Sequence, residues 1–177
     1  MKSAIFFDRD GVLTIPVSMN GKGFAPRCLE DFKYYEDAVE SLQITRAAGF
    51  LNVVVSNQPD VSTGLLLDSV LESMNNRMLQ DLELDEVNNC PHNSENNCSC
   101  RKPKPGMIKS SAERLGIDLS KSWIVGDRDG DITAGSIAGL RTVFIDRKWI
   151  EESGSSAEFR CLSLTEAVSL ILRHSSL

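Results

Sequence analysis

Short apolar runs alternate along this chain with longer segments whose apolar residues recur at helical spacing. We expect strands at the apolar runs, near residues 3–7, 51–55, 122–126 and 141–145, with a shorter strand near 159–162. The helical segments lie near residues 37–48, 66–82, 106–115, 131–139 and 164–173. Strands that alternate with helices form a mainly parallel sheet covered by helices, so the pattern predicts an α/β fold.

Length and charge restrict the class of protein further. A chain of 177 residues suits one domain with a full core. The formal net charge of −6 argues against a large nucleic-acid interface, although cations can still gather at a small phosphate site. Met1 leads almost directly into the first predicted strand, which leaves no room for a signal peptide, and no apolar run approaches membrane-spanning length. We therefore expect a cytoplasmic protein with no nucleic-acid or membrane partner.

The first predicted strand ends in two carboxylates, Asp8 and Asp10, followed by Gly11. Because side chains alternate along a strand, both carboxylates leave it with the same heading, and Gly11 permits a tight turn. Two hard oxygen donors so close together favour Mg²⁺. In phosphoryl transfer the first aspartate attacks phosphorus, while the second gives a proton to the leaving oxygen and later takes one from water. An acidic turn after a core strand is the alternative.

The second long strand ends in Ser56, Asn57 and Gln58, again a group of small polar side chains. Ligands of open α/β sheets bind at the carboxyl ends of the strands. The Ser56 hydroxyl and the groups of Asn57 hold a phosphoryl oxygen without adding charge, and Gln58 is a further candidate substrate contact. An Asn-Pro type turn that closes the strand is the alternative.

A basic segment, Arg101 to Lys104, is stiffened by prolines and precedes a predicted helix. The Lys102 ammonium is expected to offset the charge that builds on the transferring phosphoryl group and to restrain the attacking carboxylate. Arg101 is a candidate substrate contact. A solvated basic loop is the alternative for this segment.

The strand near 122–126 leads into Asp127, the third acidic strand end in the chain. Mg²⁺ requires near-octahedral oxygen donors and few protein carboxylates. We predict that Asp127 completes its ligand shell together with Asp8 and the main-chain carbonyl of Asp10. Asp131 is assigned to capping of the following helix or to support of the ligands.

These motifs resemble those of the haloacid dehalogenase superfamily of phosphotransferases, in the same order along nearly the whole chain. The DxD motif of that family matches Asp8 and Asp10, its Ser/Thr motif Ser56, its lysine Lys102, and its GDxxxD motif Gly126, Asp127 and Asp131. The resemblance implies a Rossmann-like three-layer α/β/α fold, one hydrolase domain over residues 1–177, an aspartyl-phosphate intermediate and dependence on Mg²⁺.

The stretch 88–105 lacks periodicity and contains Cys90, His92, Cys98 and Cys100. Four such ligands on one short loop suit tetrahedral Zn²⁺. Because four protein ligands close the shell, this zinc is predicted to be structural and to hold Arg101 and Lys102 in place. Reduced surface cysteines with an unrelated histidine are the alternative.

This cysteine-histidine loop followed by Arg-Lys-Pro resembles a narrower group, the heptose bisphosphate phosphatases and the histidinol phosphate phosphatases. The continuation at 102–107 is more like the heptose enzymes, whereas Thr63 stands where those enzymes often carry an arginine. The resemblance implies a phosphoric monoester hydrolase that removes the 7-phosphate of a small sugar bisphosphate, heptose 1,7-bisphosphate. Histidinol phosphate is the alternative substrate.

The segment between the first motif and the second strand is too short for a cap domain, so we expect an open site and no large cap. Four cations are candidates for gripping a second anionic group: Lys22, Arg27, Arg101 and Lys104. Plain solvation is the alternative for Lys22 and Arg27. The partner is then a small phosphorylated metabolite, and the protein a monomer or small homo-oligomer.

Three other functions use some of the same residues. A phospho-accepting signalling domain has no need for Asp10 beside its acceptor. An enzyme that removes terminal phosphate from nucleic acid would carry a basic stripe or a set of stacking aromatics, and neither is evident. A structural zinc module would have no reason to place carboxylates at three strand ends. We therefore expect a phosphatase.

Overall fold

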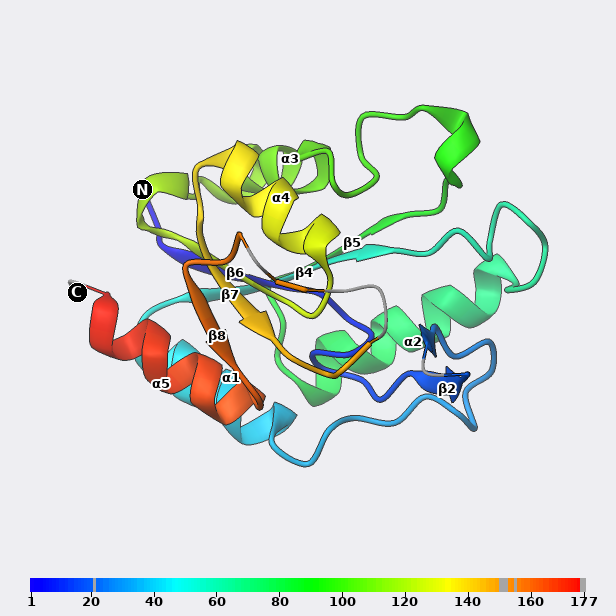
Figure 1. Cartoon of the computed structure of the whole chain (residues 1–177), viewed down its shortest axis with the longest axis horizontal. Coiled ribbons are helices and arrows are strands. Elements are labelled where there is room, and N and C mark those ends of the chain that lie inside the picture. The colour runs from blue at the N-terminus through cyan, green and yellow to red at the C-terminus, as the bar shows by residue number, and fades with distance from the viewer. Residues whose placement is uncertain (21, 150–152, 155, 176–177) are drawn as a thin grey trace.

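The described residues contain a six-stranded parallel sheet at the centre of the protein (Figure 1). The computed structural model describes residues 1–20, 22–149, 153–154 and 156–175. The strands are β1 (Ala4–Phe7), β4 (Leu51–Asn57), β5 (Glu86–Cys90), β6 (Trp123–Gly126), β7 (Arg141–Ile145) and β8 (Phe159–Cys161). They lie in the order β5-β4-β1-β6-β7-β8, with every neighbouring pair parallel.

Helices cover both faces of this sheet, which gives the predicted three-layer α/β/α arrangement (Figure 1). They are α1 (Ala38–Ala47), α2 (Asp68–Asp81), α3 (Gly106–Leu115), α4 (Asp129–Ala138) and α5 (Leu164–His174). α3 and α4 lie on one face, and α1, α2 and α5 on the other. Within the described residues, none of the helices is both long and apolar enough to span a bilayer.

Strand β1 shows why the sheet is buried on both faces. Ile5 and Phe7 belong to the apolar cluster that includes α1, α2 and α5, whereas Ala4 and Phe6 belong to the cluster on the α3 side. All four side chains are fully buried. The alternation follows from the period of two in a strand, and a run that is apolar at every position is typical of a central parallel strand.

The strand order places the site. From β1 the chain builds the sheet outward through β4 and β5, and then returns to the other side of β1 to build β6, β7 and β8. The order therefore reverses between β1 and β6, and in open α/β sheets ligands bind in the crevice outside the carboxyl ends of the strands at such a reversal. Asp8 follows β1 and Asp127 follows β6, so both lie at this crevice.

Two features differ from the sequence-based expectation. Strand β5 occupies part of the stretch predicted to be loop, because its polar residues pair with β4 at the edge of the sheet and need no apolar alternation. The segment 14–27, where no strand was predicted, contains a hairpin of β2 (Val17–Met19) and β3 (Lys22–Phe24). The other predicted strands and helices are confirmed, with ends shifted by at most two residues.

Candidate active site

The carboxyl ends of β1 and β4, the segment that carries Arg101 and Lys102, and the start of α4 enclose a pocket of about 140 Å³. Its lining residues are Asp8, Asp10, Ser56, Asn57, Pro59, Arg101, Lys102, Arg128, Gly130 and Asp131. The fold thus brings together residues that the sequence places at separate strand ends. Gln58 and Asp127, predicted for the same site, lie behind this lining and are buried.

Lys102 is the cation at the centre of the pocket. Its Nζ lies 2.8 Å from Asp8 Oδ1 and 2.6 Å from Asp131 Oδ1, and it also donates to the Val55 carbonyl at 2.6 Å. Burial by itself would lower the pKa of Lys102, but Asp131 and Asp8 outweigh burial and raise that pKa above its ordinary value. The side chain is therefore an ammonium fixed between two carboxylates.

The side chain of Asn57 holds the Lys102 segment in place. Its Nδ2 donates to the Lys102 carbonyl and its Oδ1 accepts from the Lys102 backbone N–H, both at 3.0 Å. Asn57 was predicted to contact substrate, and it does line the pocket. Its amide group is nevertheless paired with the backbone of Lys102, so its evident contribution is to position the lysine.

Three carboxylates, those of Asp8, Asp127 and Asp131, lie close together, and the one ammonium pairs with two of them. Burial first, and then the neighbouring Asp131, raise the pKa of Asp8 to about 6, while Lys102 opposes this shift. Burial, Asp8 and Asp131 raise the pKa of Asp127 well above its ordinary value. The uncompensated negative charge makes the cluster attractive to a further cation.

The donor set of this cluster fits Mg²⁺. One ligand oxygen each from Asp8, Asp127 and Asp131 lies within 4.8 Å of the other two. Asp127 Oδ1 is buried and has no hydrogen-bond partner among the described residues. A buried carboxylate oxygen without a partner is costly unless a ligand satisfies it, and carboxylate oxygens are the donors that Mg²⁺ prefers.

Gly11 lets this cluster form. Its φ is +96°, and a Cβ atom at this position would lie 1.9 Å from Asp127 Oδ2. The turn after β1 therefore needs glycine both for its backbone conformation and for the close approach of Asp127.

Asp131 has two partners, which correspond to the two roles that the sequence suggested, capping of α4 and support of the metal ligands. Its Oδ2 accepts from the Arg128 backbone N–H at 3.1 Å, which is the expected cap of α4. Its Oδ1 also pairs with Lys102, which places it in the carboxylate cluster.

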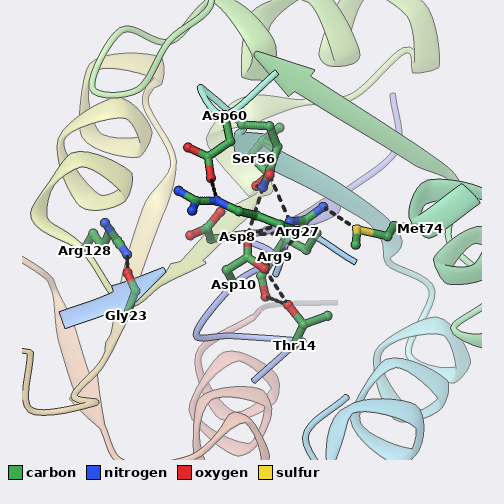
Figure 2. A network of polar contacts seen from close by, with 12 residues as sticks. Asp8, Arg9, Asp10, Thr14, Gly23, Arg27, Ser56, Asp60, Met74 and Arg128 are labelled. Carbon is green, nitrogen blue, oxygen red and sulfur yellow. Dashed lines mark hydrogen bonds and ion pairs between the residues drawn. The ribbon is translucent and has the colours of Figure 1, made fainter. Parts of the chain in front are cut away.

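Asp10 lies beside Asp8 and takes part in a second network of polar contacts (Figure 2). Arg9 pairs with it at 2.9 Å, and Thr14 Oγ1 donates to it at 2.9 Å. Gln58 Nε2 donates to Asp10 Oδ2 and to Ser56 Oγ, each at 2.8 Å, and its Oε1 accepts from Arg9 at 2.9 Å.

This network changes the expectation for two residues. Gln58 was predicted to contact substrate, but it is fully buried and its amide is occupied by Asp10, Ser56 and Arg9. Arg9, which the sequence analysis did not single out, is a fully buried cation whose guanidinium lies 5.5 Å from the centre of the Phe32 ring. The position of Arg9 between the two motif aspartates, Asp8 and Asp10, is the sequence feature that could have identified it as part of the site.

The cysteine-histidine loop brings its four predicted ligands together. Cys100 Sγ lies 3.2 Å from Cys90 Sγ and 3.3 Å from both Cys98 Sγ and His92 Nδ1. Four ligands at zinc-ligand distances in a tetrahedron lie roughly 3.4–3.8 Å apart, so the observed spacing is close to that of a zinc shell. Burial opposes ionisation of Cys98, but hydrogen bonds from the Arg101 backbone and from Cys100 and Cys90 lower its pKa to about 6. The thiolate is the metal-binding form.

The four cations predicted to bind a second anionic group do not all lie at the pocket. Arg101 lines the pocket while donating to the His92 carbonyl at 3.0 Å. Arg27 pairs with Asp60 at 2.7 Å, and Lys104 donates to Asn97 Oδ1 at 2.6 Å. Lys22 and these two do not line the pocket, whereas Arg128, which sequence reasoning missed, does.

Comparison with known proteins identifies relatives of this chain. A family model described as HAD-hydrolase-like matches residues 99–149. The chain is 34% identical over 167 residues to D-glycero-β-D-manno-heptose-1,7-bisphosphate 7-phosphatase of Pasteurella multocida, covering 87% of this chain and 88% of the relative. The protein of the same name from Pseudomonas aeruginosa is 31% identical, with 81% of each chain covered.

Solved structures resemble the fold over nearly its full length. A D,D-heptose 1,7-bisphosphate phosphatase from B. bronchiseptica, crystallised with magnesium and phosphate, has a TM-score of 0.83 and 24% identity, and covers 98% of this chain and 99% of that one. A HAD-like phosphatase from Mesorhizobium loti has a TM-score of 0.77 and 27% identity, with 96% and 86% covered. These likenesses confirm the predicted fold class.

Proposed function

The chain belongs to the haloacid dehalogenase-like hydrolases, in the family of the D-glycero-β-D-manno-heptose-1,7-bisphosphate 7-phosphatases, and from this membership we propose that it removes the 7-phosphate of a heptose 1,7-bisphosphate. It is therefore a phosphoric monoester hydrolase. The observation that carries the proposal is that Asp8 and Asp10, from one strand end, line the same pocket as Lys102. A nucleophile, a proton-transfer group and a fixed positive charge are the parts that phosphoryl transfer needs.

Asp8 is the proposed nucleophile. Lys102 holds one of its carboxylate oxygens at 2.8 Å, which fixes the direction of the carboxylate toward the pocket. Attack on phosphorus forms an acyl phosphate on Asp8 and expels the sugar oxygen. The same ammonium then lies beside the charge that develops on the transferring group, where a preorganised cation contributes most.

Asp10 is the proposed general acid and base. It gives a proton to the leaving sugar oxygen, and later takes a proton from the water that hydrolyses the phosphorylated Asp8. Its contacts with Arg9, Thr14 and Gln58 support this role, because they leave the carboxylate a single orientation at the pocket. A general acid must hold its proton within hydrogen-bond reach of the leaving oxygen.

Asp8 and Asp127, with the Asp10 carbonyl, are the proposed ligands of Mg²⁺, and Asp131 lies beside them. When bound, Mg²⁺ supplies positive charge that lets the anionic carboxylate and the anionic phosphate approach each other. The chain itself contributes Lys102, which pairs with Asp8 and Asp131 and limits their repulsion.

The remaining lining residues are proposed to hold the substrate. The Ser56 hydroxyl and the Asn57 segment contact the phosphoryl oxygens of the transferred group. Arg101 and Arg128, which line the same pocket, offer planar donors for the second phosphate. A Zn²⁺ bound by Cys90, His92, Cys98 and Cys100 is proposed to hold Arg101 in place.

Phosphate release from a panel of esters in the presence of Mg²⁺ tests the proposal. The panel contains heptose 1,7-bisphosphate, histidinol phosphate and a simple aryl phosphate, and the Asp8→Asn protein is the control for contaminating phosphatases. We expect the heptose bisphosphate to have the highest kcat/KM, with the 1-phosphate retained in the product by ³¹P NMR. Faster hydrolysis of histidinol phosphate would overturn the proposed substrate. If none of the esters is hydrolysed, the proposed phosphatase activity is overturned.

A further inference from the structure

Asp127 is held by the side chain of Trp149. The indole Nε1 donates a 2.5 Å hydrogen bond to Asp127 Oδ2, while Asp127 Oδ1 is buried without a hydrogen-bond partner among the described residues. The two oxygens of one carboxylate are therefore treated differently: the indole fixes the first, and the second remains available to a ligand. Gly11 also approaches this carboxylate closely, since a Cβ atom on Gly11 would lie 1.9 Å from Oδ2, so the carboxylate has little room to rotate.

The chemistry of this donor distinguishes Asp127 from its neighbours. Asp8 and Asp131 share the ammonium of Lys102, and Asp10 pairs with the guanidinium of Arg9. An indole N–H is a donor only and carries no charge. It therefore orients Asp127 without placing a positive charge beside it, and a bound cation can still pair with the carboxylate.

The β2–β3 hairpin clamps the indole in this position. Gly23 in β3 has no side chain, and a Cβ atom there would lie 2.9 Å from Trp149 Cζ2 and 3.1 Å from Cη2. Arg128, the residue after Asp127, donates to the Gly23 carbonyl at 2.6 Å (Figure 2). The hairpin is thus tied from beside Asp127, and it covers the ring that orients Asp127.

We propose that Trp149 is a positioning residue for the divalent cation, and that it sets the direction of the Asp127 carboxylate while the hairpin sets the direction of Trp149. This inference rests on the proposed function, since it takes Asp127 as a metal ligand. Partners that hydrogen-bond to a ligating carboxylate typically change metal affinity 10–100-fold when they are removed. We expect a loss of that size for Trp149→Phe, which keeps the aromatic ring and removes the donor.

Tryptophan fluorescence gives a direct reading of this contact. The chain has two tryptophans, and Trp123 lies at the start of β6, at the opposite end of that strand from Asp127. In the Trp123→Phe protein, Trp149 is the remaining tryptophan, and we expect its emission to change with Mg²⁺ in a saturable way. The same titration in Trp123→Phe/Asp127→Asn should show no saturable change.

Isothermal titration calorimetry with Mg²⁺ alone provides the affinities without any substrate. Trp123→Phe is the matched control and should bind Mg²⁺ like the wild type, whereas Trp149→Phe should bind 10–100-fold more weakly. Gly23→Ala, which retains both tryptophans, should also weaken binding by displacing the indole, and it serves if Trp149→Phe fails to fold.

The outcomes separate this inference from the proposed function. Weakened Mg²⁺ binding in Trp149→Phe supports the inference even if no phosphate ester is hydrolysed. Mg²⁺ affinity within twofold of the wild type in both Trp149→Phe and Gly23→Ala would overturn it, whatever happens to turnover. A wild-type protein that binds no Mg²⁺ would overturn both the metal ligands and the role of Trp149.

Discussion

Gln58 donates a 2.8 Å hydrogen bond to Asp10 across 48 positions of sequence. The residue comes from the segment after β4, whereas Asp10 belongs to the turn after β1. Because Gln58 is fully buried, its amide has no access to substrate. A polar residue from the second motif therefore acts on the carboxylate of the first motif.

Replacement of Gln58 by Leu is expected to lower kcat and to leave KM nearly unchanged. A hydrogen bond to a charged group contributes about 1.5–3 kcal/mol, so a loss of roughly 10–100-fold in kcat is expected. Steady-state kinetics checks the prediction, with Gln43→Leu on the exposed side of α1 as the matched control. A rise in KM at constant kcat would contradict this prediction and would indicate that Gln58 binds the substrate.

Asp8→Asn is expected to abolish turnover and to preserve the fold, because the amide is nearly isosteric but cannot attack phosphorus. Residual activity within tenfold of that of the wild type would contradict the assignment of Asp8 as the nucleophile. When turnover is quenched in the presence of substrate, intact-mass measurement should find a phosphorylated fraction of the wild-type protein and no phosphorylated Asp8→Asn protein. Asp68→Asn, at an exposed carboxylate at the start of α2, is the control.

Asp10→Asn is expected to reduce kcat about 10²–10⁴-fold, the usual contribution of a general acid and base. Since breakdown of the acyl phosphate needs a base, the phosphorylated Asp8 should persist longer than in the wild type with a substrate whose leaving group needs no protonation. Rapid-quench kinetics with an activated aryl phosphate measures this. Normal turnover without any change in the lifetime of the phosphoenzyme would leave Asp10 with a structural role alone.

Lys102→Ala is expected to lower kcat far more than it raises KM, because the ammonium is needed most in the transition state. It should also destabilise the protein, since breaking a buried pair leaves uncompensated carboxylates on Asp8 and Asp131, at a cost of about 3–5 kcal/mol. Urea unfolding at neutral pH gives the free energy, and Lys104→Ala on the exposed loop is the control. An effect on KM alone would place Lys102 in substrate recognition.

The cysteine-histidine loop is expected to bind one Zn²⁺ per chain, which Cys98→Ser should reduce together with activity. Cys98 is not among the buried residues of the sheet core but only packs against them, so the cooperative thermal transition should persist in Cys98→Ser. Elemental analysis of freshly purified protein measures the metal, with Cys28→Ser as the matched thiol control. A fully active chain with well under one zinc per molecule would refute the structural zinc.

Acid should destabilise the wild type more than Asp146→Asn. Hydrogen bonds from Lys148 and Arg160 hold the pKa of Asp146 well below its ordinary range. A depressed folded-state pKa contributes stability that is present above the unfolded pKa of about 4 and is lost as the pH falls through the folded value. Urea unfolding of both proteins from about pH 7 to about pH 2 should therefore show a difference in free energy that is constant above about pH 5 and shrinks as the pH falls below the unfolded value. Parallel curves would contradict this contribution from Asp146.

Elements that have a strong local pattern could be predicted from the amino-acid sequence alone. The apolar runs that became β1, β4, β6 and β7 are covered on both faces of the sheet, so most of their residues are apolar and the pattern was readable. Strand β5 was not predicted because an edge strand with polar residues gains its structure from pairing with β4, which no local pattern reports. The same holds for the β2–β3 hairpin, whose short strands carry few alternating residues.

For the site, the sequence indicated which residues gather, and only the tertiary structure decided what each one contacts. Asp8, Lys102 and the four loop ligands were found because motif spacing is local and the carboxyl ends of parallel strands meet at one edge. The contact of Gln58 with Asp10 and that of Trp149 with Asp127 depend on side-chain directions across distant segments. Those directions follow from packing between strands and loops, so they are decided only when the whole sheet has formed.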